Sequence, residues 1–188
     1  MQFKKITFFA ILSLIIFVGC DSKDNYGTND EFKNAISKEN QSINIELTTN
    51  AQQFLPVTIS KNNVKIQGYE GKIVLLDFFA TWCEPCKAEI PDLNNLRKTY
   101  SNDFEIIAVL LENNRSIEQV DAFKKEFNIN YPISNTLSNF DLANAVGGVV
   151  SIPTMFLFDQ QGNLVQKYVG MVPAEMLEID IKKMLEKN

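Results

Sequence analysis

The chain has 188 residues, of which 45% are hydrophobic and 22% charged, and its formal net charge is −5. This composition permits a full hydrophobic core and excludes a largely disordered chain, while the acidic balance argues against a nucleic-acid partner, which needs clustered Lys and Arg. The sequence contains no histidine, which excludes His-based catalytic triads and His-containing metal sites.

The first segment of the chain has the pattern of an export signal. Two lysines precede an apolar run from Ile6 to Val18, which is shorter than the ~20 residues that span a bilayer and fits the hydrophobic part of a signal peptide. The run ends in Phe-Val-Gly-Cys20, which resembles a bacterial lipobox, where the cysteine is acylated and becomes the first residue of the mature protein. We therefore expect residues 1–19 to be a lipoprotein signal peptide and Cys20 to be lipidated. The alternatives are an ordinary signal peptide and an uncleaved anchor.

A polar tether should follow the acylated cysteine. Residues 20–42 are rich in Asn, Ser, Lys and Asp, a composition typical of flexible linkers. We expect this segment to hold a single folded domain, residues 43–188, away from the membrane surface. Export would place the domain in the cell envelope, on the periplasmic or extracytoplasmic face, where oxidising conditions permit disulfide chemistry.

The first half of the folded domain contains three short alternating segments and one buried strand. Apolar and polar residues alternate at 43–47, 57–59 and 64–66, which predicts strands that form an N-terminal β-hairpin. The nearly continuous apolar run at 72–79 predicts a buried central strand. A helix should follow Cys86, with its apolar residues mainly on one face and a kink at Pro91.

The second half of the domain continues the alternation of strands and helices. We expect a buried strand at 104–111, an amphipathic helix at 117–127, a third strand at 154–158, a turn at 159–162, a closing strand at 164–169 and a helix from about residue 176. Strands that alternate with helices and end in a hairpin and a helix indicate an α/β fold, a three-layer α/β/α sandwich around a central mixed sheet.

The sequence Trp82-Cys83-Glu84-Pro85-Cys86 lies between the predicted central strand and the helix that follows it. A cysteine at a helix N-terminus faces unpaired N–H groups and the positive end of the helix dipole, and both stabilise a thiolate. The spacing lets the two sulfurs reach each other, so one can attack a substrate disulfide and the other can resolve the mixed disulfide. We expect Cys83 to be the attacking and more exposed cysteine, and Cys86 to be the resolving one.

Two other interpretations of this cysteine pair fit the sequence less well. A structural zinc site needs four Cys or His ligands, and beyond the lipobox the chain offers only Cys83 and Cys86. An inert disulfide that closes so small a loop would contribute little stability. We therefore expect redox chemistry at the pair itself, with no metal and no further cofactor.

Two stretches of the domain are similar to a known family. The run from Gly71 to Pro91 contains the pattern WCxxCxxExP, and the run from Val149 to Asp159 contains Pro153 in the context Ile-Pro-Thr. These stretches resemble the thioredoxin superfamily, and more narrowly its TlpA/ResA/CcmG group of membrane-tethered reductants. The resemblance implies a thioredoxin-like fold with an inserted helix at 117–127, and a cis peptide bond before Pro153 that packs against the active-site sulfurs.

The resemblance also suggests roles for residues beside the cysteines. Trp82 would flank the active site, although it could also belong to the core. Asp77 follows apolar residues in a buried strand, so burial should raise its pKa towards neutrality and allow it to relay the proton when Cys86 attacks. Alternatively, Asp77 is a hydrogen-bonded polar residue at a strand end. Glu84 resembles a glutamate that tunes the active-site thiol by opposing thiolate formation, or it is a solvated side chain. For Glu89 we expect a structural role.

The function implied by the resemblance is extracytoplasmic thiol–disulfide exchange. It would reduce disulfides of exported proteins such as apocytochrome c, with electrons from a membrane donor of the DsbD/CcdA type. A periplasmic disulfide oxidase or isomerase, a thiol-based copper chaperone and a peroxiredoxin are the alternatives. The absence of His and of a Met-rich loop disfavours the copper chaperone, and the WCxxC context disfavours the peroxiredoxin. The sequence leaves the direction open, because potentials in this fold range from about −270 to −120 mV.

Overall fold

The computed structural model describes residues 42–186, so the predictions for the signal peptide, Cys20 and most of the tether lie outside the described residues. The described part begins with an antiparallel sheet of three strands, β1 (Ile43–Thr48), β2 (Phe54–Ser60) and β3 (Asn63–Ile66). Strand β2 pairs with β1 on one side and with β3 on the other. The expected hairpin is therefore a three-stranded sheet, because all three alternating segments pair in sequence order.

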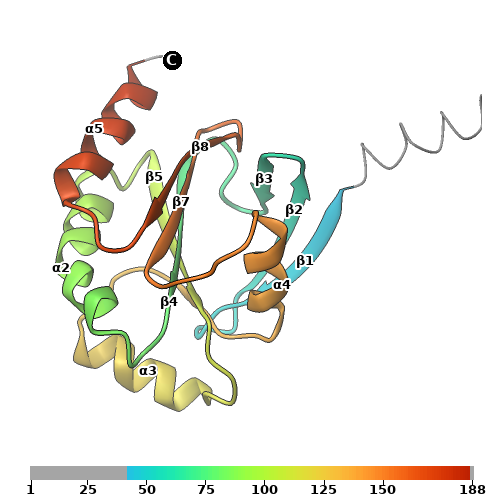
Figure 1. Ribbon diagram of the computed structural model, residues 1–188, viewed down its shortest axis with the longest axis vertical. Coiled ribbons are helices and arrows are strands. Elements are labelled where there is room, and N and C mark those ends of the chain that lie inside the picture. The colour runs from blue at the N-terminus through green and yellow to red at the C-terminus, as the bar shows by residue number, and fades with distance from the viewer. Residues whose placement is uncertain (1–41, 187–188) are drawn as a thin grey trace, which may run out of the picture. The chain divides into compact units, whose positions relative to one another are not determined.

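A five-stranded mixed sheet forms the centre of the domain (Figure 1). Its strands are ordered β6-β5-β4-β7-β8, and they comprise β4 (Ile73–Phe79), β5 (Phe104–Leu110), β6 (Ile133–Ser134), β7 (Thr154–Phe158) and β8 (Leu164–Val169). Strand β4 is parallel to β5 and antiparallel to β7. Every residue of β4 and β5 is buried, which explains why both appear in the sequence as continuous apolar runs.

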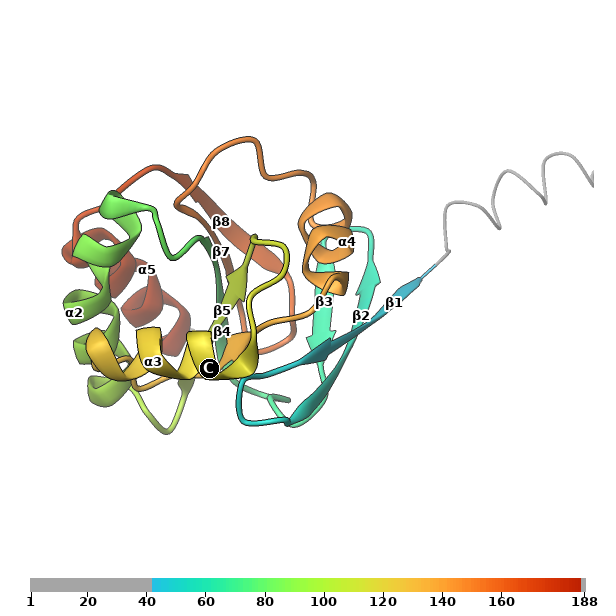
Figure 2. The same ribbon diagram turned by 90° about the horizontal axis from the view of Figure 1, so that it is seen from below.

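The two faces of the central sheet are covered differently (Figures 1 and 2). Helices α2 (Glu84–Thr99), α3 (Ile117–Glu126) and α5 (Ala174–Leu185) contribute to the core on one face, together with Ile73 and Leu75 of β4. The other face packs against β1–β3 and α4 (Ser138–Ala145) through Leu76 and Phe78. The expected three-layer fold with a mixed sheet is confirmed, although one outer layer combines a helix with the small sheet.

The turn between β7 and β8 packs closely against β3 of the small sheet. Gly162 has a φ of +83°, and a Cβ atom there would lie 2.3 Å from the carbonyl oxygen of Val64 in β3. A larger residue would therefore push the turn away from the small sheet. This turn begins at Asp159, as the sequence predicts. None of the helices in residues 42–186 is both long and apolar enough to cross a membrane.

Candidate active site

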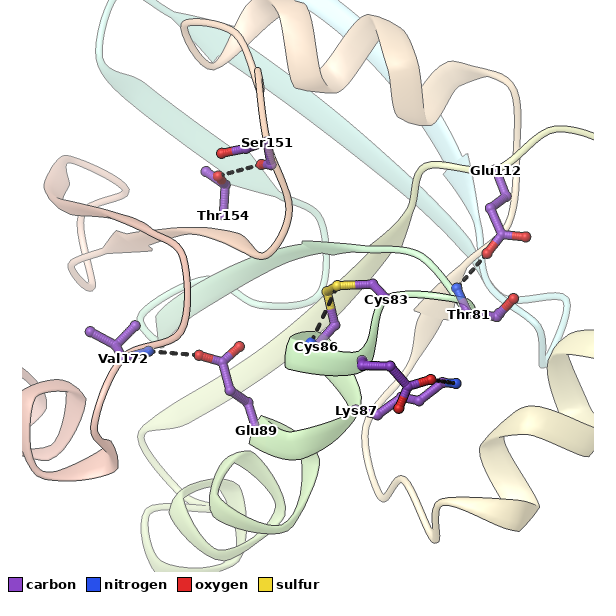
Figure 3. The surroundings of a disulfide bond; sticks show 10 residues. Thr81, Cys83, Cys86, Lys87, Glu89, Glu112, Ser151, Thr154 and Val172 are labelled. Atoms are coloured by element: carbon purple, nitrogen blue, oxygen red, sulfur yellow. Dashed lines mark hydrogen bonds and ion pairs between the residues drawn. A yellow bond between two sulfur atoms is a disulfide. The ribbon is translucent and has the colours of Figure 1, made fainter.

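Cys83 and Cys86 form a disulfide at the N-terminus of α2, with the two Cα atoms 5.3 Å apart (Figure 3). Cys83 is the N-cap residue, and its Sγ accepts a hydrogen bond from the Cys86 N–H at 3.3 Å. Pro85 lies in the first turn, where its missing N–H removes no helical hydrogen bond. The Cys83 sulfur thus lies where free N–H groups and the helix dipole would stabilise a thiolate.

The disulfide is buried. Cys83 is 4% exposed and Cys86 is 5% exposed, so the prediction that Cys83 is the more exposed cysteine is wrong for this disulfide form. The physical reason is that the bonded sulfurs share one environment, within the core cluster between α2 and the sheet. The N-cap position, rather than exposure, is what distinguishes Cys83 from Cys86.

Trp82 directly precedes Cys83 in the chain, and the turn before β7 packs against the core cluster that contains the disulfide. Trp82 is 65% exposed, so it belongs to the rim of the site and not to the core. The Ile152–Pro153 peptide bond is cis, as the resemblance implied. Ile152 packs against the core cluster that contains both cysteines, and the Thr154 hydroxyl donates a 2.7 Å hydrogen bond to the Ser151 carbonyl (Figure 3). The turn that carries Pro153 is therefore fixed beside the core that surrounds the disulfide.

Asp77 is buried in β4, on the face that also carries Leu75 and Phe79 and that packs against α2. Its Oδ1 atom has no hydrogen-bond partner among the described residues. Burial, and then the nearby charge of Glu89, raises the pKa of Asp77 to about 7. Of the two interpretations open for Asp77, the structure favours a titratable buried acid over a hydrogen-bonded polar residue, because this pKa lets the carboxyl exchange a proton near neutral pH.

Glu89 has a property that the sequence analysis missed. It lies in α2, one turn after Cys86, and its side chain accepts a 2.8 Å hydrogen bond from the Val172 N–H (Figure 3). Its other oxygen, Oε2, has no partner among the described residues. Burial raises the pKa of Glu89 to about 7, so it is a second titratable acid as well as a structural anchor. Its spacing of three residues from Cys86 was the available signal, because that spacing puts both side chains on one face of a helix.

Tyr131 shows that the two acids share one environment. Its ring is buried in the same core cluster. Burial raises the pKa of Tyr131, and the charges of Asp77 and Glu89 raise it further. Cys86, Asp77 and Glu89 thus lie in one buried layer between the sheet and α2.

Glu84, by contrast, faces solvent. Its side chain is 80% exposed and pairs with Lys87 at 2.6 Å. Water and the Lys87 ammonium therefore screen its charge from the cysteine pair. Of the two interpretations open for Glu84, the structure favours the solvated side chain.

Comparison with known proteins identifies the family. The Redoxin family model matches residues 29–185. The chain belongs to the Redoxin family. The thiol–disulfide oxidoreductase ResA of Bacillus thuringiensis is 30% identical, over 97% of this chain and 98% of the relative. The crystal structure of a thiol:disulfide interchange protein of the thioredoxin family from Chlorobium tepidum matches with a TM-score of 0.58 and 29% identity, over 76% of this chain and 93% of that one.

These relatives and the cysteine pair make this Redoxin protein a thiol–disulfide oxidoreductase of the ResA type. Its cysteines lie at a helix N-terminus, next to a layer with two titratable acids. A thiolate at a helix N-terminus can attack a disulfide, and a carboxyl group with a pKa near 7 can exchange a proton. Within residues 42–186, no group of three or more Cys, Asp or Glu side chains is arranged to hold a metal ion.

Proposed function

We propose that this Redoxin-family enzyme reduces disulfides in exported polypeptides, apocytochrome c among them, from a lipid-anchored position on the extracytoplasmic face of the membrane. The observation that carries the proposal is the Cys83–Cys86 pair at the N-terminus of α2, in the sequence pattern WCxxCxxExP that resembles membrane-tethered reductants. The similarity to ResA, a thiol–disulfide oxidoreductase, supports the reaction type.

The first step of the proposed reaction starts from the dithiol enzyme. The Cys83 thiolate attacks one sulfur of the substrate disulfide and forms a mixed disulfide with it. The other substrate sulfur leaves as a thiolate and takes up a proton from water. The N-terminus of α2 favours this step because it stabilises the attacking thiolate.

The second step releases the substrate. Cys86 attacks the Cys83 sulfur, the bond between Cys83 and the substrate breaks, and the Cys83–Cys86 disulfide forms. We assign the proton of Cys86 to the Asp77 carboxylate, because Asp77 is buried on the side of β4 that faces α2 and its pKa is about 7. The second substrate sulfur leaves as a thiolate and takes up a proton from water, while Asp77 holds the proton of Cys86. Two electrons have then passed from the enzyme to the substrate disulfide.

A membrane electron donor of the DsbD/CcdA type would return the enzyme to the dithiol state. The donor type rests on the family resemblance, and its access to the enzyme rests on the predicted signal peptide at 1–19, the predicted lipidation of Cys20 and the polar segment that precedes residue 43. Such a tether would keep the domain within reach of both a membrane donor and exported clients.

The direction of electron flow rests on the family resemblance. The solvated position of Glu84 removes the argument that this carboxylate opposes thiolate formation at Cys83. A thiolate that is strongly stabilised makes the disulfide a better oxidant, as in DsbA. An oxidase is therefore the function against which the proposal must be tested.

The redox state of the pair in the cell separates these functions. Cells that express the full chain are quenched in acid, alkylated, and compared with fully reduced and fully oxidised references by gel mobility. We expect Cys83 and Cys86 to be mainly dithiol. A mainly oxidised pair, together with a potential near −120 mV, the approximate value for DsbA, would make the protein an oxidase.

A further inference from the structure

A carboxylate outside the cysteine motif is attached to the turn that precedes Cys83. Glu112, which follows β5, accepts a hydrogen bond from the backbone N–H of Thr81 (Figure 3). Its second carboxylate oxygen accepts a 2.6 Å hydrogen bond from Nε of Arg115. The Glu112 side chain is only 9% exposed, whereas the Arg115 side chain is 35% exposed, so water reaches the ion pair from the side of the arginine.

The carboxylate of Glu112 is held in its charged form. Burial alone would raise its pKa, but the hydrogen bonds from Arg115 and Thr81 outweigh burial and hold the pKa below its ordinary value. Hydrogen bonds to an ionised carboxylate are about twice as strong as neutral ones. The carbonyl of Arg115 in turn accepts a 3.0 Å hydrogen bond from the Asn135 side chain, which fixes the position of the arginine.

The hydrogen bond between Glu112 and Thr81 lies in the turn that leads into Cys83. The Cys83 N–H donates to the Ala80 carbonyl at 3.1 Å and closes the turn between β4 and α2. Thr81 lies inside this turn, and its N–H has Glu112 as its partner. When the disulfide is reduced, the bond between the sulfurs of Cys83 and Cys86 is lost, while the 3.1 Å hydrogen bond from the Lys87 N–H to the Cys83 carbonyl still holds the backbone at the start of α2. The remaining constraints on the turn then decide whether the Cys83 sulfur stays at the helix N-terminus.

We propose that Glu112 is a positioning residue for Cys83, which acts by anchoring the Thr81 backbone and so keeps the Cys83 sulfur over the N-terminus of α2. The proposal rests on the proposed function in that Cys83 is the attacking thiolate. Arg115 holds the carboxylate in place and balances its charge, so Glu112 acts through geometry and not as a negative charge beside the thiolate.

Two variants of Glu112 with similar side-chain volume separate an effect of geometry from an effect of negative charge. Glu112→Gln keeps an oxygen that can accept the Thr81 hydrogen bond, whereas Glu112→Met removes both the acceptor and the charge. The readout is the rate at which iodoacetamide alkylates Cys83 across a pH series in the reduced full-length protein, located by mass spectrometry. Glu46→Met, which removes an exposed carboxylate on β1 by the same substitution, is the matched control.

We expect Glu112→Met to alkylate about fivefold more slowly at neutral pH, the effect of losing one hydrogen bond, with the midpoint of its pH profile moved upward. Glu112→Gln should recover most of the wild-type rate, and the control should match wild type. Faster alkylation in both Glu112 variants would mean that the residue acts by its charge, and this would overturn the proposal. A folded Met variant with wild-type kinetics would overturn it as well.

A second measurement uses the wild-type protein alone, in case the Met variant does not fold. Hydrogen exchange of the reduced protein should show that the Thr81 amide is protected. Exchange of this amide at the rate of an open loop would overturn the proposal that Glu112 anchors it. Neither readout needs a substrate. Reduction of insulin disulfides by wild type tests the proposed function separately, so failure of that function is distinguishable from failure of the Glu112 inference.

Discussion

Asp77 and Glu89 lie in the same buried layer, and each has one carboxylate oxygen without a hydrogen-bond partner among the described residues. Their pKa values are both raised to about 7, chiefly by burial. The charge of Glu89 adds to the shift of Asp77, so ionising one acid makes it harder to ionise the other. We therefore expect the two groups to titrate as a coupled pair near neutral pH.

This burial predicts how stability depends on pH. The native state keeps the proton of Asp77 up to about pH 7, whereas the unfolded chain loses it near its ordinary pKa of 3.8. Between these values the unfolded state binds fewer protons, so the free energy of unfolding falls as pH rises. Glu89, whose pKa is raised from 4.5 to about 7, contributes in the same direction.

Asp77→Asn should remove the share of this pH dependence that belongs to Asp77. We expect the variant to be more stable than wild type by a margin that grows as pH rises from about 4 to about 7 and then stays constant, in urea unfolding of the oxidised protein. The same variant should slow the resolution of a mixed disulfide by about 10²-fold, with little change in its formation. Equal rates of both steps in variant and wild type would remove Asp77 from the mechanism, and a large effect of Glu89→Gln alone would assign the proton to Glu89.

Among the strands and helices, the sequence best predicted those whose pattern arises from their own residues. Strands β4 and β5 are buried on both faces, so their apolar runs predicted them directly. Helix α3 has an amphipathic pattern and a capping box formed by Ser116 and Gln119. Such signals arise from residues that are close in the chain.

The missed elements depend on distant residues instead. Helix α4 has no side-chain hydrogen bond at its N-cap. Its buried Asn139 donates to the carbonyls of Leu110 and Ser134, which belong to other elements. Strand β6 has only two residues and exists through its pairing with β5. Neither feature leaves a periodic pattern in the sequence.

The same distinction applies to the site. Its motif residues Cys83, Cys86 and Pro153 could be predicted from the sequence pattern. The hydrogen bonds that Glu89 and Glu112 accept could not, because the donors, the N–H groups of Val172 and Thr81, lie 83 and 31 residues away in the chain. The equal burial of the two cysteines also depends on tertiary packing, which the motif does not encode.

At the scale of the whole molecule, the site lies where β4 ends and α2 begins, at the carboxyl end of a central strand. This is the usual place for active sites in open α/β sheets. The chain before residue 42 would determine where this domain operates. If its predicted lipobox cysteine is acylated, that residue links the chemistry of the domain to the membrane.

Cys20→Ala tests that link. Loss of the acylated cysteine should release the protein from membranes or leave its signal peptide uncleaved, because lipidation requires the thiol. Cell fractionation and the mass of the mature N-terminus report both effects, with Cys83→Ser as the control for removing a cysteine elsewhere. A Cys20→Ala protein that is normally processed and still membrane-bound would contradict lipidation at this position.

The central claim is that disulfide exchange proceeds through Cys83 and is completed by Cys86. Trapping the mixed disulfide tests it most directly, with full-length variants mixed with a disulfide-containing polypeptide and the products separated with and without a reducing agent. Cys86→Ser should accumulate a long-lived, reducible adduct through Cys83, and Cys83→Ser should form no adduct and be inactive. An adduct through Cys86 in Cys83→Ser would reverse the two roles, and the absence of an adduct in both variants would contradict exchange at this site.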